Sequence, residues 1–276
     1  MIKVGEYNHL KISREVDFGV YLDDGKEGIL LPKRFVPENA KVGDEIKVFL
    51  YHDSEDRLIA TTQQPKGKVG DIVRLKAVGT THQGAFLDNG LMKDLFVPKS
   101  QQLTRMMPGG EYIVRIYIDE RTGRMAATEK IDQFLSNESL DVKEMDMVHL
   151  MVLRRSQIGY VMAINHKHTG VLHFNEIFRD IRVGDSFSGF IKKIHEGNKI
   201  DVVIGKPGYQ KVEDEVHKIL QLLEENNGYL PYNDKSDPED IYSFFGMSKK
   251  TFKMTTGNLY KQRKIEFTKT GIKLVG

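Results

Sequence analysis

Four short sequence landmarks recur along this chain in a constant order, and this internal repeat limits the possible folds more than any other feature. The first landmark, Val4-Gly5-Glu6, returns as Val69-Gly70-Asp71 and loosely as Glu144-Met145-Asp146. All four landmarks return 65 or 66 residues later in the second copy, and the third copy follows the second at 75 or 76 residues. The second landmark occupies 18–22, 83–87 and 158–162.

Each copy contains short runs that alternate apolar and polar residues and stop at glycine or aspartate, which predicts β-strands. Residues 45–50 and 112–117 are clear examples, and the segment 34–40 leaves room for about one turn of helix. The expected order is strand, strand, strand, short helix, strand, strand. This is the order of a small Greek-key barrel of the OB-fold type, whose closure leaves no long unpaired edge.

The sequence changes character after Lys206-Pro207-Gly208, where helical spacing replaces strand alternation. The chain has 276 residues, enough for two or more domains, so a separate C-terminal domain is expected here. Apolar residues at three- and four-residue steps predict one face of its first helix. These residues are Val212, Val216, Ile219, Leu220 and Leu223.

A short second helix through Phe245 has two possible starting points. Either Ser236 begins it, with Glu239 completing a capping box, or Asp237 begins it, with Pro238 in the first turn. The sequence does not separate these two registers.

A third helix and a hairpin complete the C-terminal domain. Gly246 is expected to form a turn, and Ser248 to cap a helix that runs to about Lys264. Residues 265–268 and 272–275 alternate as the two strands of a hairpin. This is the winged variant of the helix-turn-helix. We therefore predict a multidomain, mainly β protein, with three tandem barrels followed by an α+β winged-helix domain. The expected domains are 1–64, 66–131, 144–206 and 210–276.

Charge is unevenly divided along the chain. The total is 41 basic against 39 acidic residues, or +2. From Met247 onward, eight lysines and arginines face Glu266 as the only acid, so the last 30 residues carry +7 and the first 246 carry −5. Such an asymmetry is typical of proteins that bind nucleic acid or other acidic surfaces.

Several function classes are disfavoured by what the sequence lacks. Cysteine is absent, which removes disulfides, thiolate metal sites and cysteine nucleophiles. No apolar stretch approaches the roughly 18 residues of a membrane span, and the first residues show no signal-peptide core. We therefore expect a cytoplasmic protein without membrane contact.

Catalytic and cofactor chemistry also finds no support in the sequence. No phosphate-binding, hydrolase, metalloprotease or dinucleotide motif occurs. His166, His168 and His173 lie close together, but no carboxylate stands at ligand spacing, and turn chemistry explains them better than a metal. We expect no catalytic residues, no cofactor and no metal.

The first barrel offers the residues of a single-strand binding face. Phe18 and Tyr21 are expected on the second strand and Arg57 on the fifth, and such barrels place these strands on the same side. Exposed aromatics there would stack on bases while basic residues neutralise phosphates. The alternative is that Phe18 and Tyr21 fill the barrel core.

These residues carry a resemblance to a known family. The pattern Phe18-Gly19-x-Tyr21-Leu22, then Gly28-Ile29-Leu30, then 42–48 resembles the ribosomal protein S1 domain, an RNA-binding OB fold. Three such copies followed by a winged helix are similar to the conserved virulence factor B family of bacteria, over essentially the whole chain. The resemblance implies RNA binding and regulation of gene expression at the RNA level.

The resemblance also implies specific RNA-binding positions in the first copy. Phe18 and Tyr21 match the two stacking aromatics of the S1 domain, and Asp53 and Arg57 match its polar pair. Leu31 stands where the family pattern has a histidine.

The second copy keeps fewer of these positions. Phe86 and Arg124 match an aromatic and the basic residue, and Glu120 stands at the acidic position. Gln83 replaces the first aromatic, and Val97 replaces the histidine.

In the third copy, His173 matches the histidine and Lys199 the basic residue, whereas His195 replaces the acid. Tyr160, displaced by one residue, would restore a stacking ring only if the strand register slips. The residues that replace the two aromatics are Ile158 and Val161. The number of working RNA faces therefore stays open.

The winged-helix domain carries the clearest electrostatic argument. Lys249, Lys250 and Lys253 start its third helix, and Lys249 and Lys253, four residues apart, are expected on one face. Lys269 and Lys273 of the hairpin would extend this basic patch toward phosphates. The alternative is a solvated lysine face that only keeps the protein soluble.

Three functions compete on these grounds. The first is a non-enzymatic protein that binds single-stranded or unpaired RNA. The second is a DNA-binding transcription regulator that acts through its winged helix, with the barrels as spacers. The third is a protein-binding scaffold on the ribosome or in an RNA-processing assembly, since both domain types are used in that way.

Overall fold

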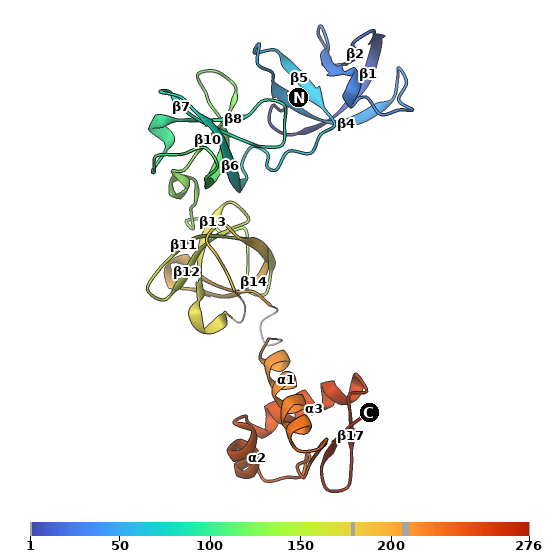
Figure 1. Ribbon diagram of the computed structural model, residues 1–276, viewed down its shortest axis with the longest axis vertical. Coiled ribbons are helices and arrows are strands. Elements are labelled where there is room, and N and C mark those ends of the chain that lie inside the picture. The colour runs from blue at the N-terminus through green and yellow to red at the C-terminus, as the bar shows by residue number, and fades with distance from the viewer. Residues whose placement is uncertain (1, 178–179, 206–209, 276) are drawn as a thin grey trace. The chain divides into compact units, whose positions relative to one another are not determined.

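The computed structural model describes residues 2–177, 180–205 and 210–275, with side chains at 210–214 left aside. The chain divides into two compact units, Met1–Val202 and Val203–Gly276 (Figure 1). The first unit holds three closed five-stranded barrels and the second a small α+β domain. The predicted fold class is confirmed.

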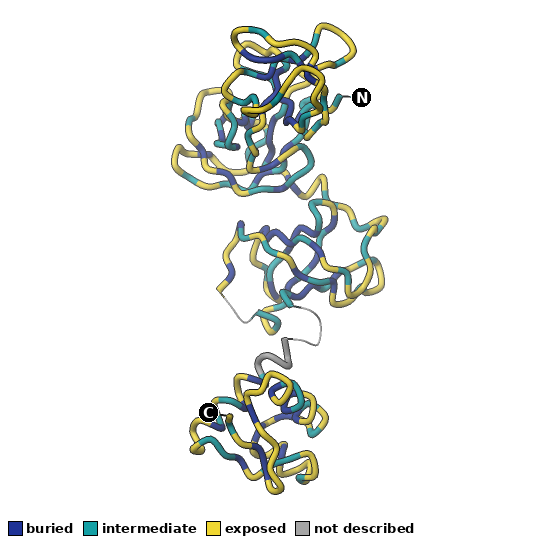
Figure 2. Tube along the Cα trace, turned by 90° about the vertical axis from the view of Figure 1, so that its right-hand side faces the viewer, coloured by how far each residue is buried: buried dark blue, intermediate teal, exposed yellow. Residues whose placement is uncertain are grey.

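Barrel 1 has the strand order β1-β2-β3-β5-β4. The pair β3 and β5 is parallel, through Leu30 and Ile59, and the other pairs are antiparallel. Its core contains Ile12, Leu22 and Leu31, which are buried. Figure 2 shows buried and exposed residues alternating along the barrel strands. Its elements are β1 (Tyr7–Val16), β2 (Gly19–Leu22), β3 (Ile29–Pro32), the 3-10 helix η1 (Lys33–Phe35), β4 (Glu45–His52) and β5 (Leu58–Thr61).

Barrels 2 and 3 repeat this path, so that the order of strands and the helical turn after the third strand match the expectation in every copy. Barrel 3 has a second turn, η5, before its last strand. Barrel 2 consists of β6 (Ile72–Thr80), β7 (Gly84–Leu87), β8 (Leu95–Pro98), η2 (Lys99–Gln101), β9 (Glu111–Ile118) and β10 (Met125–Thr128). Barrel 3 follows the short helix η3 (Ile131–Phe134) and consists of β11 (Met147–Arg155), β12 (Gly159–Ile164), β13 (His168–His173), η4 (Phe174–Glu176), β14 (Ser186–His195), η5 (Glu196–Asn198) and β15 (Lys199–Val203).

One glycine opens the second strand of every barrel, and each lies against the backbone of the third strand. A Cβ atom on Gly19 would lie 2.2 Å from the carbonyl oxygen of Leu31. On Gly84 it would lie 2.2 Å from that of Val97, and Gly159 is in the same position against Leu172, at 2.1 Å. No side chain fits at these distances, so the close approach of the two strands requires glycine.

The barrels of the first unit are joined by apolar contacts as well as by the chain. Phe49, Tyr51 and Ile59 on the outside of barrel 1 pack against Leu91 and Met125 of barrel 2. A second cluster joins barrel 2 to barrel 3 and contains Ile72, Ile113, Ile131, Leu135, Met151, Leu153 and Ala163.

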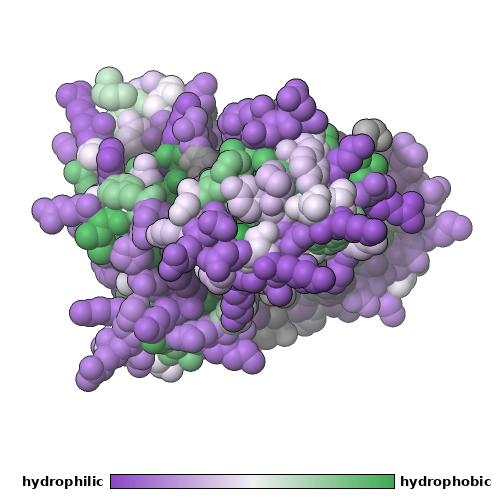
Figure 3. Space-filling model, turned by 90° about the horizontal axis from the view of Figure 1, so that it is seen from below, coloured by the Kyte–Doolittle hydropathy of each residue, from purple (hydrophilic) through white to green (hydrophobic). Residues whose placement is uncertain are grey.

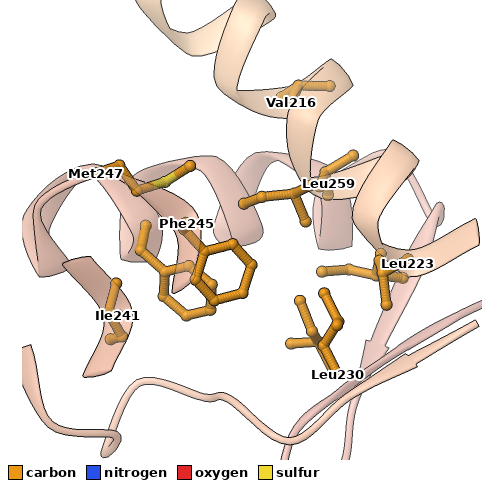
Figure 4. Close-up of a cluster of buried hydrophobic side chains, with 11 residues drawn as sticks. Val216, Leu223, Leu230, Ile241, Phe245, Met247 and Leu259 are labelled. Carbon is orange, nitrogen blue, oxygen red and sulfur yellow. The ribbon is translucent and has the colours of Figure 1, made fainter. Parts of the chain in front are cut away.

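The second unit is the expected winged helix. Its core brings together Leu223 of α1, Phe245 of α2, Leu259 of α3 and Leu230 (Figure 4). Val212, expected on the inner face of the first helix, lies outside the residues whose side chains are described. The elements are α1 (Gln210–Glu225), β16 (Tyr229–Leu230), α2 (Pro238–Phe245), α3 (Lys249–Lys261), β17 (Ile265–Phe267) and β18 (Ile272–Leu274).

The helix boundaries settle the open start of α2 and test the expected ends of α3. Asp237 caps α2, its side chain accepting a hydrogen bond from the backbone amide of Glu239, and Pro238 lies in the first turn. Ser248 caps α3 as expected. The expected end of this helix near Lys264 is wrong: α3 ends at Lys261, because Arg263 adopts a left-handed backbone conformation with φ of 56°.

The short strand β16 was missed by sequence reasoning. It pairs with β18 through Tyr229 with Lys273 and Leu230 with Ile272, which makes the wing a three-stranded sheet. Two residues are too few to show an alternating pattern, so the strand exists only through its tertiary pairing.

The close approach of the second and third strands predicts the effect of a single methyl group. We expect Gly84→Ala to destabilise barrel 2 by about 1–3 kcal/mol or more, since the added Cβ overlaps a backbone oxygen. Gly79→Ala is the matched control, because Gly79 lies in β6 of the same barrel and a Cβ atom added there would meet nothing within 4 Å. Hydrogen exchange of the amides in 69–130 measures both effects. Equal protection in the two variants would contradict this account.

Candidate nucleic-acid interface

The two aromatic residues expected to bind RNA in barrel 1 lie on its outside. Phe18, which immediately precedes β2, is 58% exposed, and Tyr21 on β2 is half-buried. Their rings meet edge to face, with centroids 6.5 Å apart. Neither ring belongs to the hydrophobic core of the barrel. The alternative that Phe18 and Tyr21 fill the interior is therefore wrong.

Arg14 adds a cation to this pair. Its guanidinium carbon lies 4.2 Å from the centroid of the Tyr21 ring, in a cation–π contact. The position follows from strand pairing, because Arg14 of β1 lies opposite Tyr21 of β2. Sequence reasoning missed Arg14. The alternation of side chains along β1, once β1 is paired with β2, would have placed Arg14 on the same face as Tyr21. We call Arg14, Phe18 and Tyr21 the stacking platform.

Asp53 and Arg57 form an ion pair in the loop between β4 and β5, so Arg57 precedes the fifth strand rather than lying on it. The Arg57 side chain donates from Nε and Nη2 to Asp53 Oδ2, at 2.9 and 2.7 Å. Burial alone would raise the pKa of the Asp53 carboxyl, but hydrogen bonds from the side chain and amide of Arg57 and from the amide of Glu55 lower it. Glu55 also pairs with Arg57, at 2.8 Å.

Arg57 belongs to the same neighbourhood as the stacking platform. Its hydrogen bond to Asp53 is the main cause that raises the pKa of Arg57, and the nearby Tyr21 phenol contributes in the same direction. The two carboxylates that hold Arg57 offset most of its charge. Arg14 on the platform forms no ion pair among the described residues, so it is the more available cation for a phosphate.

Barrel 2 presents a different aromatic pair. Phe86 of β7 lies opposite Phe96 of β8, and the two half-buried rings are 5.2 Å apart. Phe96 was missed by sequence reasoning, because only strand pairing brings it beside Phe86. Arg124 forms an ion pair with Asp56 of barrel 1. Gln83, at the position of Phe18, is exposed.

The acidic position of barrel 2 requires a correction. In barrel 1, the backbone amide of Asp53 donates a hydrogen bond to the carbonyl of Arg57. In barrel 2, the equivalent hydrogen bond runs from the amide of Asp119 to the carbonyl of Arg124. Asp119, not Glu120, is therefore the equivalent of Asp53. The side chain and amide of Thr122 hold the Asp119 carboxylate and lower its pKa.

Barrel 3 brings two histidines to one carboxylate. His173 Nε2 lies 2.9 Å from Asp201 Oδ1, and His195 Nε2 lies 2.8 Å from Asp201 Oδ2. Burial would raise the pKa of Asp201, but the two histidine hydrogen bonds outweigh it and lower that pKa. Asp201 was missed by sequence reasoning, which looked for the polar pair at His195 and Lys199. Asp201 lies two residues beyond Lys199, the exposed first residue of β15.

The alignment of the third copy was wrong by one residue in β13. His173 pairs with Gly159, just as Pro32 pairs with Gly19 and Pro98 with Gly84. The counterparts of His173 are therefore these prolines, which end the third strand. The residues assigned to that position, Leu31 and Val97, are fully buried core residues equivalent to Leu172.

The register of β12 does not slip. Tyr160 pairs with Leu172, so Tyr160 takes the place of Val20 and not that of Tyr21. Its ring contacts Phe174 at 5.8 Å instead of joining Ile158, which is 58% exposed.

The three histidines in and just before β13 do not converge. His166 Nδ1 accepts a hydrogen bond from the amide of Ile72, His168 contacts Asp141 at 2.7 Å, and His173 contacts Asp201. Within the described residues, no group of three or more histidine and acidic side chains is arranged to hold a metal ion.

The lysines of the winged helix are only partly arranged as expected. Lys250 and Lys253 are exposed on α3, whereas Lys249, its first residue, is half-buried. The inner face of α3 is buried through Phe252, Thr256 and neighbouring residues. The other exposed lysines among the described side chains of this unit are Lys218, Lys235, Lys261, Lys264, Lys269 and Lys273.

An aromatic pair lies beside these lysines. Tyr260 of α3 and Phe267 of β17 are both exposed, and their rings are 5.2 Å apart. Figure 3 looks onto this unit and shows a mostly hydrophilic surface with smaller hydrophobic areas.

Among the helices that the structure describes, none is long and apolar enough to cross a membrane.

Comparison with known proteins agrees with this architecture. The family model of the S1 domain matches residues 4–63 and 69–130, and that of the CvfB-like winged helix domain matches residues 217–274. Both are nucleic-acid-binding domain types and not enzyme families.

Similar proteins cover nearly the whole chain. The uncharacterized protein YitL of Bacillus subtilis (strain 168) is 27% identical over 96% of this chain and 91% of its own length. Conserved virulence factor B of Staphylococcus epidermidis (strain ATCC 12228 / FDA PCI 1200) is 27% identical over 85% of this chain and 83% of its own length. A solved multidomain protein with nucleic acid binding domains from Streptococcus pneumoniae covers 99% of this chain and 98% of its own, with a TM-score of 0.42 and 22% identity. On the family models and the sequence relatives, the chain contains two S1 domains and a CvfB-like winged helix domain, and its resemblance to the conserved virulence factor B family is confirmed.

Proposed function

We propose that this chain binds single-stranded or unpaired RNA in the cytoplasm, without catalysis, and regulates gene expression at the RNA level. The observation that carries the proposal is the stacking platform: Phe18 is exposed, Tyr21 is half-buried, and Arg14 lies over the Tyr21 ring. Unpaired bases stack on such rings, and a nearby guanidinium neutralises the phosphate that follows.

The platform favours unpaired over duplex nucleic acid. Bases in a duplex are already stacked on one another, so they cannot cover the Phe18 and Tyr21 rings without being unpaired first. The lysines of the winged helix attract phosphates of either kind of strand, since Lys250 and Lys253 act as point charges. In this proposal the C-terminal unit supplies attraction, and the barrels supply the preference for unpaired bases.

Removing the platform rings tests the proposal. We expect Phe18→Ala and Tyr21→Ala each to weaken binding of a single-stranded RNA by about 1–3 kcal/mol, the usual loss for one base stacked on an aromatic ring. Fluorescence anisotropy with a labelled homopolymer oligonucleotide measures the affinity. Tyr242→Ala is the matched control, because Tyr242 is an aromatic that is 67% exposed and lies outside the platform, on α2. Unchanged affinity in the Phe18 and Tyr21 double variant would overturn the site.

The lysines of α3 give a separate prediction. We expect Lys250→Gln and Lys253→Gln to lower the slope of log affinity against log salt by about 0.7 each, the value for one phosphate contact of a single strand. Lys235→Gln is the control, since Lys235 is exposed in the loop before α2 of the same unit. An unchanged slope would show that these lysines only solvate the surface.

The same assay decides between RNA binding and the DNA-binding alternative. A regulator that acts on duplex DNA through its winged helix would release single-stranded RNA when duplex DNA is added at physiological salt. We expect the reverse order of affinity. Displacement of the RNA by equimolar duplex DNA would favour the alternative.

A further inference from the structure

A cavity of about 830 Å³ lies between barrels 1 and 2. Barrel 2 contributes the aromatic pair Phe86 and Phe96 together with Lys93 and Arg124, and barrel 1 contributes the end of β4. The volume falls in the range of small-molecule sites in proteins. We call this the inter-barrel cavity. The residues that line it from barrel 1 are Tyr51, His52 and Ser54.

The aromatic side of the inter-barrel cavity can hold a flat base. Phe86 and Phe96 are half-buried, 5.2 Å apart and inclined by 44°. Every nucleobase has a face that stacks on such rings, whatever its sequence.

Two residues that line the cavity each carry a polar atom with no partner in the described part of the chain. The hydroxyl of Tyr51 and Nδ1 of His52 are both buried and accept or donate no hydrogen bond. Tyr51 as a whole is only 3% exposed. An unpaired buried polar group costs free energy, so a partner from outside the chain would relieve it.

His52 enters this arrangement as a neutral ring. Burial is the main cause that lowers the pKa of His52, and the positive charges of Lys93 and Arg124 lower it further. The negative charges of Asp56 and Asp53 raise this pKa but do not outweigh the other causes. A neutral imidazole can accept or donate a hydrogen bond at Nδ1, as the edge of a base requires.

The cations of the cavity are held by one acidic side chain. Asp56, in the β4–β5 loop of barrel 1, forms ion pairs with Arg124 and, at 3.5 Å, with Lys93. Lys93 also donates to the backbone carbonyl of Asp53, at 2.6 Å. A carboxylate bridging an arginine and a lysine occupies the place where a phosphate would bind.

We propose that the inter-barrel cavity is a nucleotide site built jointly by the first two barrels. The base stacks on Phe86 and Phe96, its edge reaches Tyr51 and His52, and its phosphate displaces Asp56 from Lys93 and Arg124. If the bound nucleotide is part of an RNA strand, this site rests on the proposed function. If it is a free nucleotide, the site does not depend on that function, because a free nucleotide offers the same base and phosphate.

Two sources of this chemistry are separated by two probes. One is a labelled single-stranded RNA oligonucleotide, and the other is each of the four ribonucleoside monophosphates, titrated by calorimetry against the full chain. Binding of the monophosphates assigns the cavity to free nucleotides. Binding of the oligonucleotide alone, with the variant effects below, assigns it to one nucleotide of a strand. Binding of neither probe overturns the proposal.

Tyr51→Phe is the central variant, since it removes only a hydroxyl that has no partner among the described residues and so leaves the packing of Tyr51 in place. We expect binding of the probe to weaken about two- to tenfold, the range for one lost hydrogen bond. Tyr117→Phe is the matched control, because Tyr117 follows Ile116 in β9 as Tyr51 follows Leu50 in β4 and does not line the cavity.

Asp56→Asn is a second variant, for which the proposal predicts a gain of affinity that misfolding would not produce. Asp56 has a φ of 64°, a conformation that asparagine also adopts, so this variant keeps the loop. We expect tighter binding of the probe, because Lys93 and Arg124 are freed for the phosphate. Unchanged binding in both Tyr51→Phe and Asp56→Asn overturns the proposal. If the Phe18 and Tyr21 variants still lose RNA affinity in that case, the proposed function stands without this site.

Discussion

The contact between the second and third strands of each barrel is the constraint on which the rest of this structure depends. Gly19, Gly84 and Gly159 allow the two backbones to approach more closely than any side chain permits. This contact fixes which residues of the second strand point inward. It thereby places Tyr21 and Phe86 on the outer face, while the residue before each glycine turns toward solvent.

The cations of the barrel faces are largely neutralised within the chain. Arg57 is held by Asp53 and Glu55, and Arg124 by Asp56. The exposed lysines of the winged helix have no such partners among the described ion pairs. The positive charge lies in the last 30 residues, which carry +7, whereas residues 203–246 of the same unit carry −5 and the barrel unit, residues 1–202, holds 29 basic and 29 acidic residues. In the proposed function, the barrels contribute stacking and geometry, and the basic last 30 residues contribute attraction to phosphates.

The sequence was sufficient to predict the architecture because the repeat and the alternation of strands are local properties. Phe18 and Tyr21 could be placed for the same reason. The alignment of His173 failed because a strand register depends on pairing, and a shift of one residue moves a side chain to the other face. Arg14, Phe96 and Asp201 become visible only when neighbouring strands are paired. The contact of Asp56 with Arg124 joins two barrels, and no pattern within one copy encodes it.

The central claim is that unpaired RNA lies on the outer face of the first barrel. The most direct test is photo-crosslinking of the full chain to a single-stranded RNA that contains 4-thiouridine, followed by mass spectrometry of the crosslinked peptides. The account predicts crosslinks at Phe18 and Tyr21. Crosslinks confined to residues 217–274, with none in residues 4–63, would contradict it.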